Sequence, residues 1–147
     1  MKKIILIFIV LQISVFSLQA QDASNEKAEL LRTNQELGAS FKAEKWDESL
    51  KLAQKAINLN IKIYGEETIE TAAAFKNLAI IYRAKKKFDD AIVNFQKAVK
   101  IYRLDADKNE KSIVRTLYDV AVTYYLNEDF WQANKFGLES LSLAEKV

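Results

Sequence analysis

The chain has 147 residues, with 22 Lys and Arg against 20 Asp and Glu, and it contains no His, Cys or Pro. These absences exclude disulfides, thiolate chemistry, His-based metal sites and Ser-His-Asp catalysis. With only three Gly, the chain is also poor in the residues that form tight turns between strands, so we expect a single helical domain.

Residues 1–20 have the pattern of a secretory signal peptide. Two lysines precede an apolar run from Ile4 to Leu18, and a small residue, Ala20, follows. The run is shorter than the roughly 20 residues that a membrane-spanning helix needs. We expect cleavage after Ala20 and export to the periplasm or the medium of a bacterium. Cleavage after Ala23, an uncleaved anchor and a buried core helix remain alternatives.

All of the formal net charge lies in this leader. Without Lys2 and Lys3 the chain carries 20 basic and 20 acidic residues, so the remainder is formally neutral. Nucleic-acid and membrane-surface binding favour a net basic domain, and we therefore expect neither of them, nor stable membrane insertion after cleavage.

Three aromatic residues, Trp46, Phe88 and Phe130, lie 42 residues apart. Each begins a segment in which a small residue follows three positions later, after a polar pair in the first two copies and Trp131-Gln132 in the third. A pair ending in a small residue lies upstream in each copy, with an aromatic three residues later: Leu37-Gly38 and Phe41, Leu78-Ala79 and Tyr82, Val120-Ala121 and Tyr124. For these upstream pairs the first two copies are 41 residues apart and the last two are 42 apart. We assign the missing residue to the first turn.

Apolar residues recur at the helical spacing of three to four within each copy. This periodicity predicts six helices, at about 24–44, 47–63, 67–85, 88–103, 109–127 and 130–146. We expect Gly65 to end a helix and Thr68 or Thr71 to cap the next one. The acidic run over residues 105–110 has alternating ligand-type side chains but lacks the Gly and Glu of a calcium loop, so we interpret it as a polar inter-repeat turn.

The repeated residues resemble those of the tetratricopeptide repeat (TPR) family. The middle copy matches best, through Phe75, Leu78, Ala79, Tyr82, Phe88, Ala91, Phe95 and Ala98. The 42-residue unit is similar to the long repeats of kinesin light chains and of many bacterial exported proteins. The resemblance implies an all-α solenoid of three helical hairpins, with six antiparallel helices over residues 24–147. The repeats are expected at about 24–64, 67–106 and 109–147.

The resemblance also implies a concave surface, lined by the first helix of each hairpin, that binds a protein or an extended peptide. The residues at the family's binding positions are Arg32, Gln35, Ala39, Lys42, Lys76, Asn77, Ile80, Arg83, Arg115, Tyr118, Asp119, Val122 and Tyr125. These residues predict a locally basic groove suited to an acidic segment. The alternative is that these are ordinary solvated polar residues that bind no ligand.

We therefore expect a non-enzymatic interaction scaffold without cofactor or metal. The alternative is the N-terminal sensory or assembly region of a larger signalling or enzymatic protein. The last predicted helix would leave Leu138, Leu141 and Leu143 exposed unless further repeats or a second copy cover them.

Overall fold

The computed structural model describes the backbone of residues 2–146 and the side chains of residues 21–146. The side chains of the predicted signal peptide, residues 1–20, lie outside this part. The described backbone forms six α-helices and one 3-10 turn: α1 (Lys2–Lys42), α2 (Trp46–Tyr64), α3 (Ile69–Ala84), α4 (Phe88–Tyr102), η1 (Arg103–Asp105), α5 (Ala106–Leu126) and α6 (Phe130–Ala144). Both candidate cleavage sites fall within α1.

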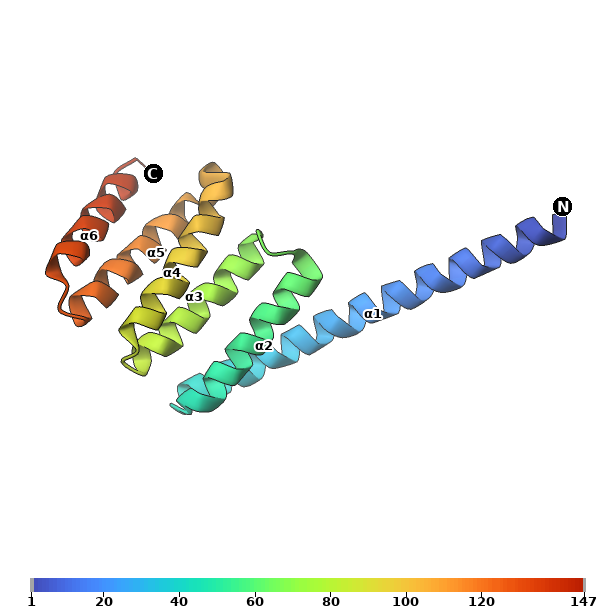
Figure 1. Ribbon diagram of the computed structural model, residues 1–147, viewed down its shortest axis with the longest axis horizontal. Coiled ribbons are helices and arrows are strands. Elements are labelled where there is room, and N and C mark those ends of the chain that lie inside the picture. The colour runs from blue at the N-terminus through green and yellow to red at the C-terminus, as the bar shows by residue number, and fades with distance from the viewer. Residues whose placement is uncertain (1, 147) are drawn as a thin grey trace.

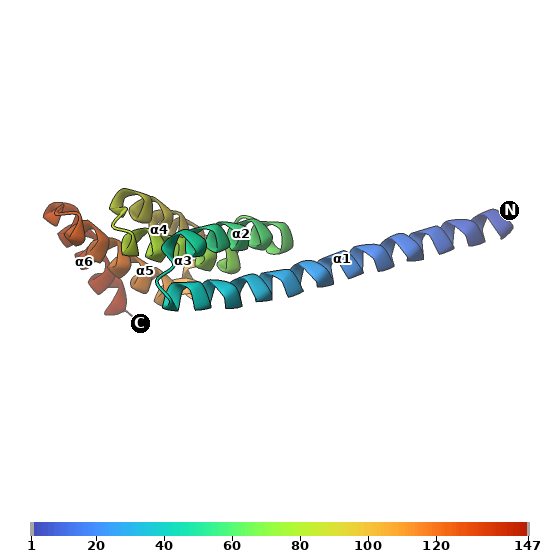
Figure 2. The same cartoon turned by 90° about the horizontal axis from the view of Figure 1, so that it is seen from below.

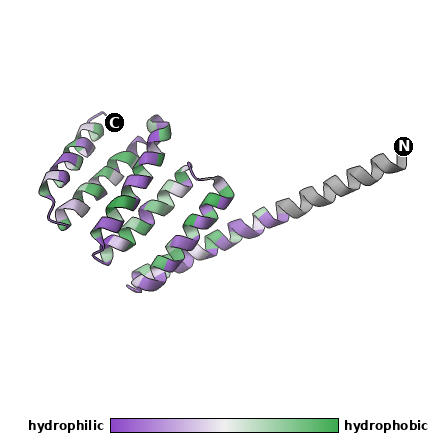
Figure 3. Ribbon diagram, in the orientation of Figure 1, coloured by the Kyte–Doolittle hydropathy of each residue, from purple (hydrophilic) through white to green (hydrophobic). Residues whose placement is uncertain are grey.

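The helices lie side by side in chain order, and α6 is at the end of the row (Figure 1). Turned by 90°, the row shows α2 and α4 on one side and α1 on the other (Figure 2). From residue 21 onward hydrophobic and hydrophilic residues alternate along the helices, as amphipathic helices require (Figure 3). This arrangement confirms the predicted all-α solenoid of helical hairpins. Within residues 21–146, whose side chains are described, no helix is long and apolar enough to span a membrane.

Two predicted helix ends are confirmed by their capping geometry. Gly65 follows α2 with a φ of 100°, and its backbone N–H donates to the carbonyl of Ile61. The Thr68 side chain accepts a hydrogen bond from the backbone N–H of Thr71 at 3.4 Å at the start of α3. Glycine adopts positive φ without a steric penalty, and threonine satisfies a free N–H group, so each residue ends or begins its helix for a physical reason.

The expected polar turn over residues 105–110 is wrong. The chain passes from α4 through η1 directly into α5, which begins at Ala106 rather than near residue 109. The Asn109 side chain donates to the carbonyl oxygens of Tyr102 at 3.3 Å and Asp105 at 2.9 Å. These two bonds satisfy carbonyls at the helix junction, which keeps the connection helical.

The three hairpin turns repeat at exactly 42 residues, so the predicted 41-residue step is wrong. Each turn has a backbone hydrogen bond of 2.9–3.0 Å across five residues: Lys45 to Ser40, Lys87 to Tyr82 and Asp129 to Tyr124. Each also has one residue of positive φ: Glu44, Lys86 and Glu128. Ser40 is therefore the counterpart of Tyr82, and no residue is missing from the first turn.

The same register makes Leu37, rather than Gly38, the counterpart of Ala79. Leu37 is buried and Gly38 is exposed. A Cβ atom added at Gly38 would meet nothing within 4 Å. Close helix packing therefore does not require this glycine. Its small size, like that of Ala79 and Ala121, explains why the sequence predicts the wrong register for the first copy.

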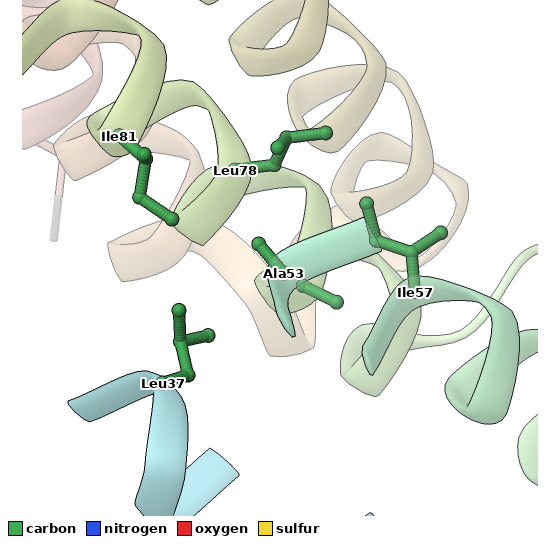
Figure 4. Close-up of a cluster of buried hydrophobic side chains, with 6 residues drawn as sticks. Leu37, Ala53, Ile57, Leu78 and Ile81 are labelled. Carbon is green, nitrogen blue, oxygen red and sulfur yellow. The ribbon is translucent and has the colours of Figure 1, made fainter. Parts of the chain in front are cut away.

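Buried side chains connect each hairpin to the next. In one cluster Leu37 of α1 lies with Ala53 and Ile57 of α2 and with Leu78 and Ile81 of α3 (Figure 4). Because α3 belongs to the second hairpin, this cluster is shared between hairpins, as expected of repeats that complete one another's cores.

Candidate functional site: the concave groove

A groove of about 580 Å³ lies between α1 and α3, with α2 as its floor. Its walls come from the first helices of two successive hairpins. The α1 wall consists of Leu30, Asn34, Leu37, Gly38, Phe41 and Lys42, and the α3 wall consists of Glu70, Ala73, Ala74, Asn77, Ile80 and Ile81. The floor consists of Ala53, Ala56, Asn60 and Tyr64.

Side-chain size explains why the groove is open at this place. Ala53 and Asn60 stand on its floor, whereas their counterparts 42 residues later are Phe95 and Tyr102, both buried. Between α3 and α5 the Arg83 guanidinium also reaches the Asp119 carboxylate at 2.9 Å. Large floor residues and this ion pair occupy in the second repeat the space that small floor residues leave free in the first.

The groove is mostly apolar. Its charged lining residues are Lys42 and Glu70, one of each sign, in contrast to the locally basic groove expected from the sequence. The amides of Asn34 and Asn77 are exposed on opposite walls. An amide offers two donors and an acceptor, which match the N–H and C=O groups of an extended peptide backbone.

Lys42, Asn77 and Ile80 are the predicted binding residues that line this groove. Arg115 and Tyr118 line a second hollow, of about 510 Å³, with Lys111, Val114, Ser140 and Ala144. Four of these residues follow groove residues by 84 positions: Val114, Tyr118, Ser140 and Ala144 correspond to Leu30, Asn34, Ala56 and Asn60. The second hollow is therefore the same part of the solenoid surface, two repeats later, without a following helix as its third wall.

Other predicted residues have structural partners. Arg32 pairs with Glu36 at 3.7 Å on α1, and its counterpart Ala74 belongs to the core between α2 and α3. Arg83 stacks over the Phe95 ring at 5.3 Å besides pairing with Asp119. Both arginines therefore make their contacts away from the open groove.

The remaining predicted residues line neither hollow: Gln35, Ala39, Lys76, Asp119, Val122 and Tyr125. Sequence reasoning missed Asn34, Gly38 and Phe41, because the first copy was aligned one residue out of register. A strict 42-residue count back from Lys76, Ile80 and Arg83 would have found them.

Two tyrosine hydroxyls of the solenoid have raised pKa values. Burial raises the pKa of the Tyr102 hydroxyl and is the main cause of the raised pKa of Tyr124, so both phenols are neutral at pH 7. Within the described part of the chain, no three acidic residues come together as a metal site would require.

The helical hairpins, their 42-residue period and the groove between successive first helices define a repeat protein of the solenoid class. The sequence model for the tetratricopeptide repeat matches residues 27–104, and the chain belongs to this family. None of the curated proteins matches the sequence.

Three solved structures share the fold. BtubC (BKLC) from P. vanneervenii is 16% identical with a TM-score of 0.74, over 80% of this chain and 47% of its own. The TPR domain of Arabidopsis FLU is 16% identical with a TM-score of 0.72, over 83% of this chain and 99% of its own. A putative kinesin light chain from Podospora anserina is 16% identical with a TM-score of 0.69, over 80% of this chain and 56% of its own.

The chain therefore spans about half the length of BtubC and of the putative kinesin light chain. These likenesses confirm the long, kinesin-light-chain-like repeat type. The family fold supports the coarse function of a protein–protein interaction scaffold.

Proposed function

We propose that this protein is a non-enzymatic scaffold that binds an extended peptide segment of a partner protein in the groove between α1 and α3. The observation that carries the proposal is the open groove of about 580 Å³ with apolar walls and two facing amides. Apolar pockets bind side chains, and a few placed polar groups orient the ligand.

The chemistry of the groove indicates which segment fits. Phe41, Ile80 and the small floor residues Ala53 and Ala56 offer an apolar surface. Asn34 and Asn77 can bond the peptide backbone from the two walls. The bound part of the partner is therefore an extended stretch with at least one large apolar side chain.

Acidic residues of the partner fit the far end of the same surface. Lys111 and Arg115 line the second hollow beside the exposed ring of Tyr118. A guanidinium binds a carboxylate through two parallel hydrogen bonds. We thus place the acidic part of the ligand at α5, and its apolar part at α1 and α3.

A peptide selection tests the proposal. Random peptides displayed on phage are selected on the purified chain, and the dissociation constants of the enriched peptides are measured by fluorescence anisotropy. We expect enrichment of an apolar motif and, for Ile80→Asp, an affinity loss of about ten-fold or more, since a buried charge would then face the apolar ligand.

Val93→Asp is the matched control, because Val93 is half exposed on α4 and lines neither hollow. Equal binding by the wild type and Ile80→Asp, with both folded by circular dichroism, contradicts the groove assignment.

We also propose that the protein is exported, on the strength of the basic, apolar and small-residue pattern of residues 1–20. Mass spectrometry of the chain from a bacterial envelope fraction should find an N-terminus at Gln21 or Ser24. An intact Met1 in a cytoplasmic fraction alone contradicts the proposal.

A further inference from the structure

The outer face of α6 lacks the cover that α2 and α4 have. Ile57 of α2, Val99 of α4 and Leu141 of α6 occupy one repeat position at 42-residue steps. Their exposed fractions are 2%, 5% and 56%. In the first two hairpins the next hairpin covers this position, and α6 has only α5 beside it (Figure 1).

Two polar rim positions of the earlier hairpins are apolar in α6. Asp47 bonds Lys85 of the next hairpin at 2.5 Å, and Asp89 accepts a hydrogen bond from Asn127 at 3.2 Å. The counterpart of both aspartates is Trp131, which is 70% exposed.

Gln54 and Gln96 likewise correspond to Leu138, which is 57% exposed. Gln96 bonds the Tyr124 hydroxyl of the following hairpin at 3.4 Å. Exposed apolar residues replace polar residues at both rim positions of the terminal helix.

The central strip of α6 changes in the opposite direction. The α4 residues Ile92, Phe95 and Tyr102, all buried, have Asn134, Gly137 and Ala144 as counterparts. Ala53 and Asn60 of α2 are small as well, and α3 still packs on α2. The position that sets α6 apart is therefore Asn134, which stands where the earlier hairpins have Leu50 and Ile92. The face of α6 is not a copy of the surface between hairpins.

Three exposed apolar residues of α6 and Asn134 instead have the spacing of a two-helix seam. Trp131, Asn134, Leu138 and Leu141 follow one another at steps of three, four and three. This is the a/d spacing of a coiled coil, in which each a position of one antiparallel helix faces a d position of the other. Two copies of α6 with a two-fold axis near residue 136 place Trp131 against Leu141, and Asn134 against Leu138, of the second copy.

The N-terminal end of the solenoid does not offer an alternative surface for α6. The α1 counterparts of Ala74 and Leu78, which pack on α2, are Arg32 and Glu36, an exposed ion pair. Covering α6 with α1 of another copy would bury both charges. Pairing is thus between like faces, which gives a closed two-fold dimer rather than an open chain.

We propose that two copies of this protein associate through the outer faces of α6, in an antiparallel arrangement centred on Asn134 and Leu138. The dimer keeps the groove between α1 and α3 free in both copies, since that groove lies at the other end of the row. One dimer therefore presents two peptide grooves.

Sedimentation equilibrium of the full chain tests the association. Trp131→Asp and Leu138→Gln restore the residues of the other two hairpins, so the fold should be retained by circular dichroism. We expect a monomer–dimer equilibrium for the wild type, and an increase of about ten-fold or more in the dissociation constant for the double variant. Leu104→Glu, at an exposed leucine on η1, is the control that should still dimerise.

Cysteine cross-linking tests the arrangement, because the chain has no cysteine of its own. Mixing Asn134→Cys with Leu138→Cys should give a disulfide-linked dimer faster than either variant alone. A monomeric wild type, a dimer unchanged by the double variant, or cross-links formed mainly by one variant alone overturns the proposal. Each of these outcomes leaves the groove proposal to its own peptide test.

Discussion

At the scale of single residues, the size of the floor side chains helps to determine where the concave surface is open. Ala53 lies on the groove floor, and its counterpart Phe95 is fully buried and packs between Ala79 and Val120. The phenylalanine strengthens the contact between the second and third hairpins, while the alanine leaves space for a ligand. Repeats with the same backbone period thus hold two hairpins together in one place and leave a groove for a ligand in another.

Thr33 gives a prediction at this scale. Its side chain is fully buried, and its hydroxyl has no hydrogen-bond partner. A buried hydroxyl without a partner costs about 1–3 kcal/mol. Thr33→Val keeps the shape and removes this cost, so urea denaturation should show a free energy of unfolding higher by about 1 kcal/mol.

Thr116→Val is the matched control for this prediction. Thr116 is equally buried, but its hydroxyl donates to the Ser112 carbonyl at 2.6 Å. This substitution should bring no comparable gain. A Thr33→Val chain less stable than the wild type would contradict the assignment of an unsatisfied hydroxyl.

At the scale of helices, ion pairs tie α1 to α2 and α2 to α3. Lys55 of α2 bonds Glu29 of α1 at 2.7 Å, and Lys85 at the end of α3 bonds Asp47 of α2 at 2.5 Å. Hydrogen bonding to these lysines lowers the pKa of both carboxyl groups below their ordinary values. The pairs therefore stabilise the helix contacts only while the carboxylates are ionised.

The lowered pKa values predict a loss of stability in acid. The contribution is fully present above the ordinary pKa, 4.5 for Glu29, and is lost as the pH falls through the lower pKa of the folded state. Urea denaturation at pH 7 and pH 3 should show this decrease in the wild type, and a smaller one in Glu29→Gln and Lys55→Met. An identical decrease in all three chains would contradict a role for the pair.

The sequence predicted the helices well and the first hairpin's register poorly. Apolar periodicity and caps such as Gly65 and Thr68 locate helix ends because they act locally. The register of α1 depends on which residues face α2, and Gly38 resembles a packing glycine in sequence although it is exposed. The ion pair of Arg83 with Asp119 joins residues 36 positions apart, and no local pattern reveals it.

At the scale of the whole molecule, the two ends of the solenoid differ in chemistry. The outer face of α1 carries Arg32 and Glu36, whereas the outer face of α6 exposes Trp131, Leu138 and Leu141. Repeat arrays need polar outer surfaces at their ends for solubility. The polar face of α1 agrees with this requirement, and the apolar face of α6 is the surface that a second copy covers in the dimer we propose.

Gly38→Leu is the sharpest test of ligand binding in the groove between α1 and α3. Gly38 lies about one turn before the end of α1 and lines the groove, with no atom near its missing Cβ. Its counterparts Ile80 and Val122 carry large side chains. Leucine should raise the free energy of unfolding by about 1 kcal/mol, because glycine is a poor helix former.

The same leucine fills the groove and should weaken binding of the selected peptide by about ten-fold or more in fluorescence anisotropy. We predict that the variant chain is more stable than the wild type and binds the peptide less tightly. A chain that is more stable and binds the peptide as tightly as the wild type would contradict it.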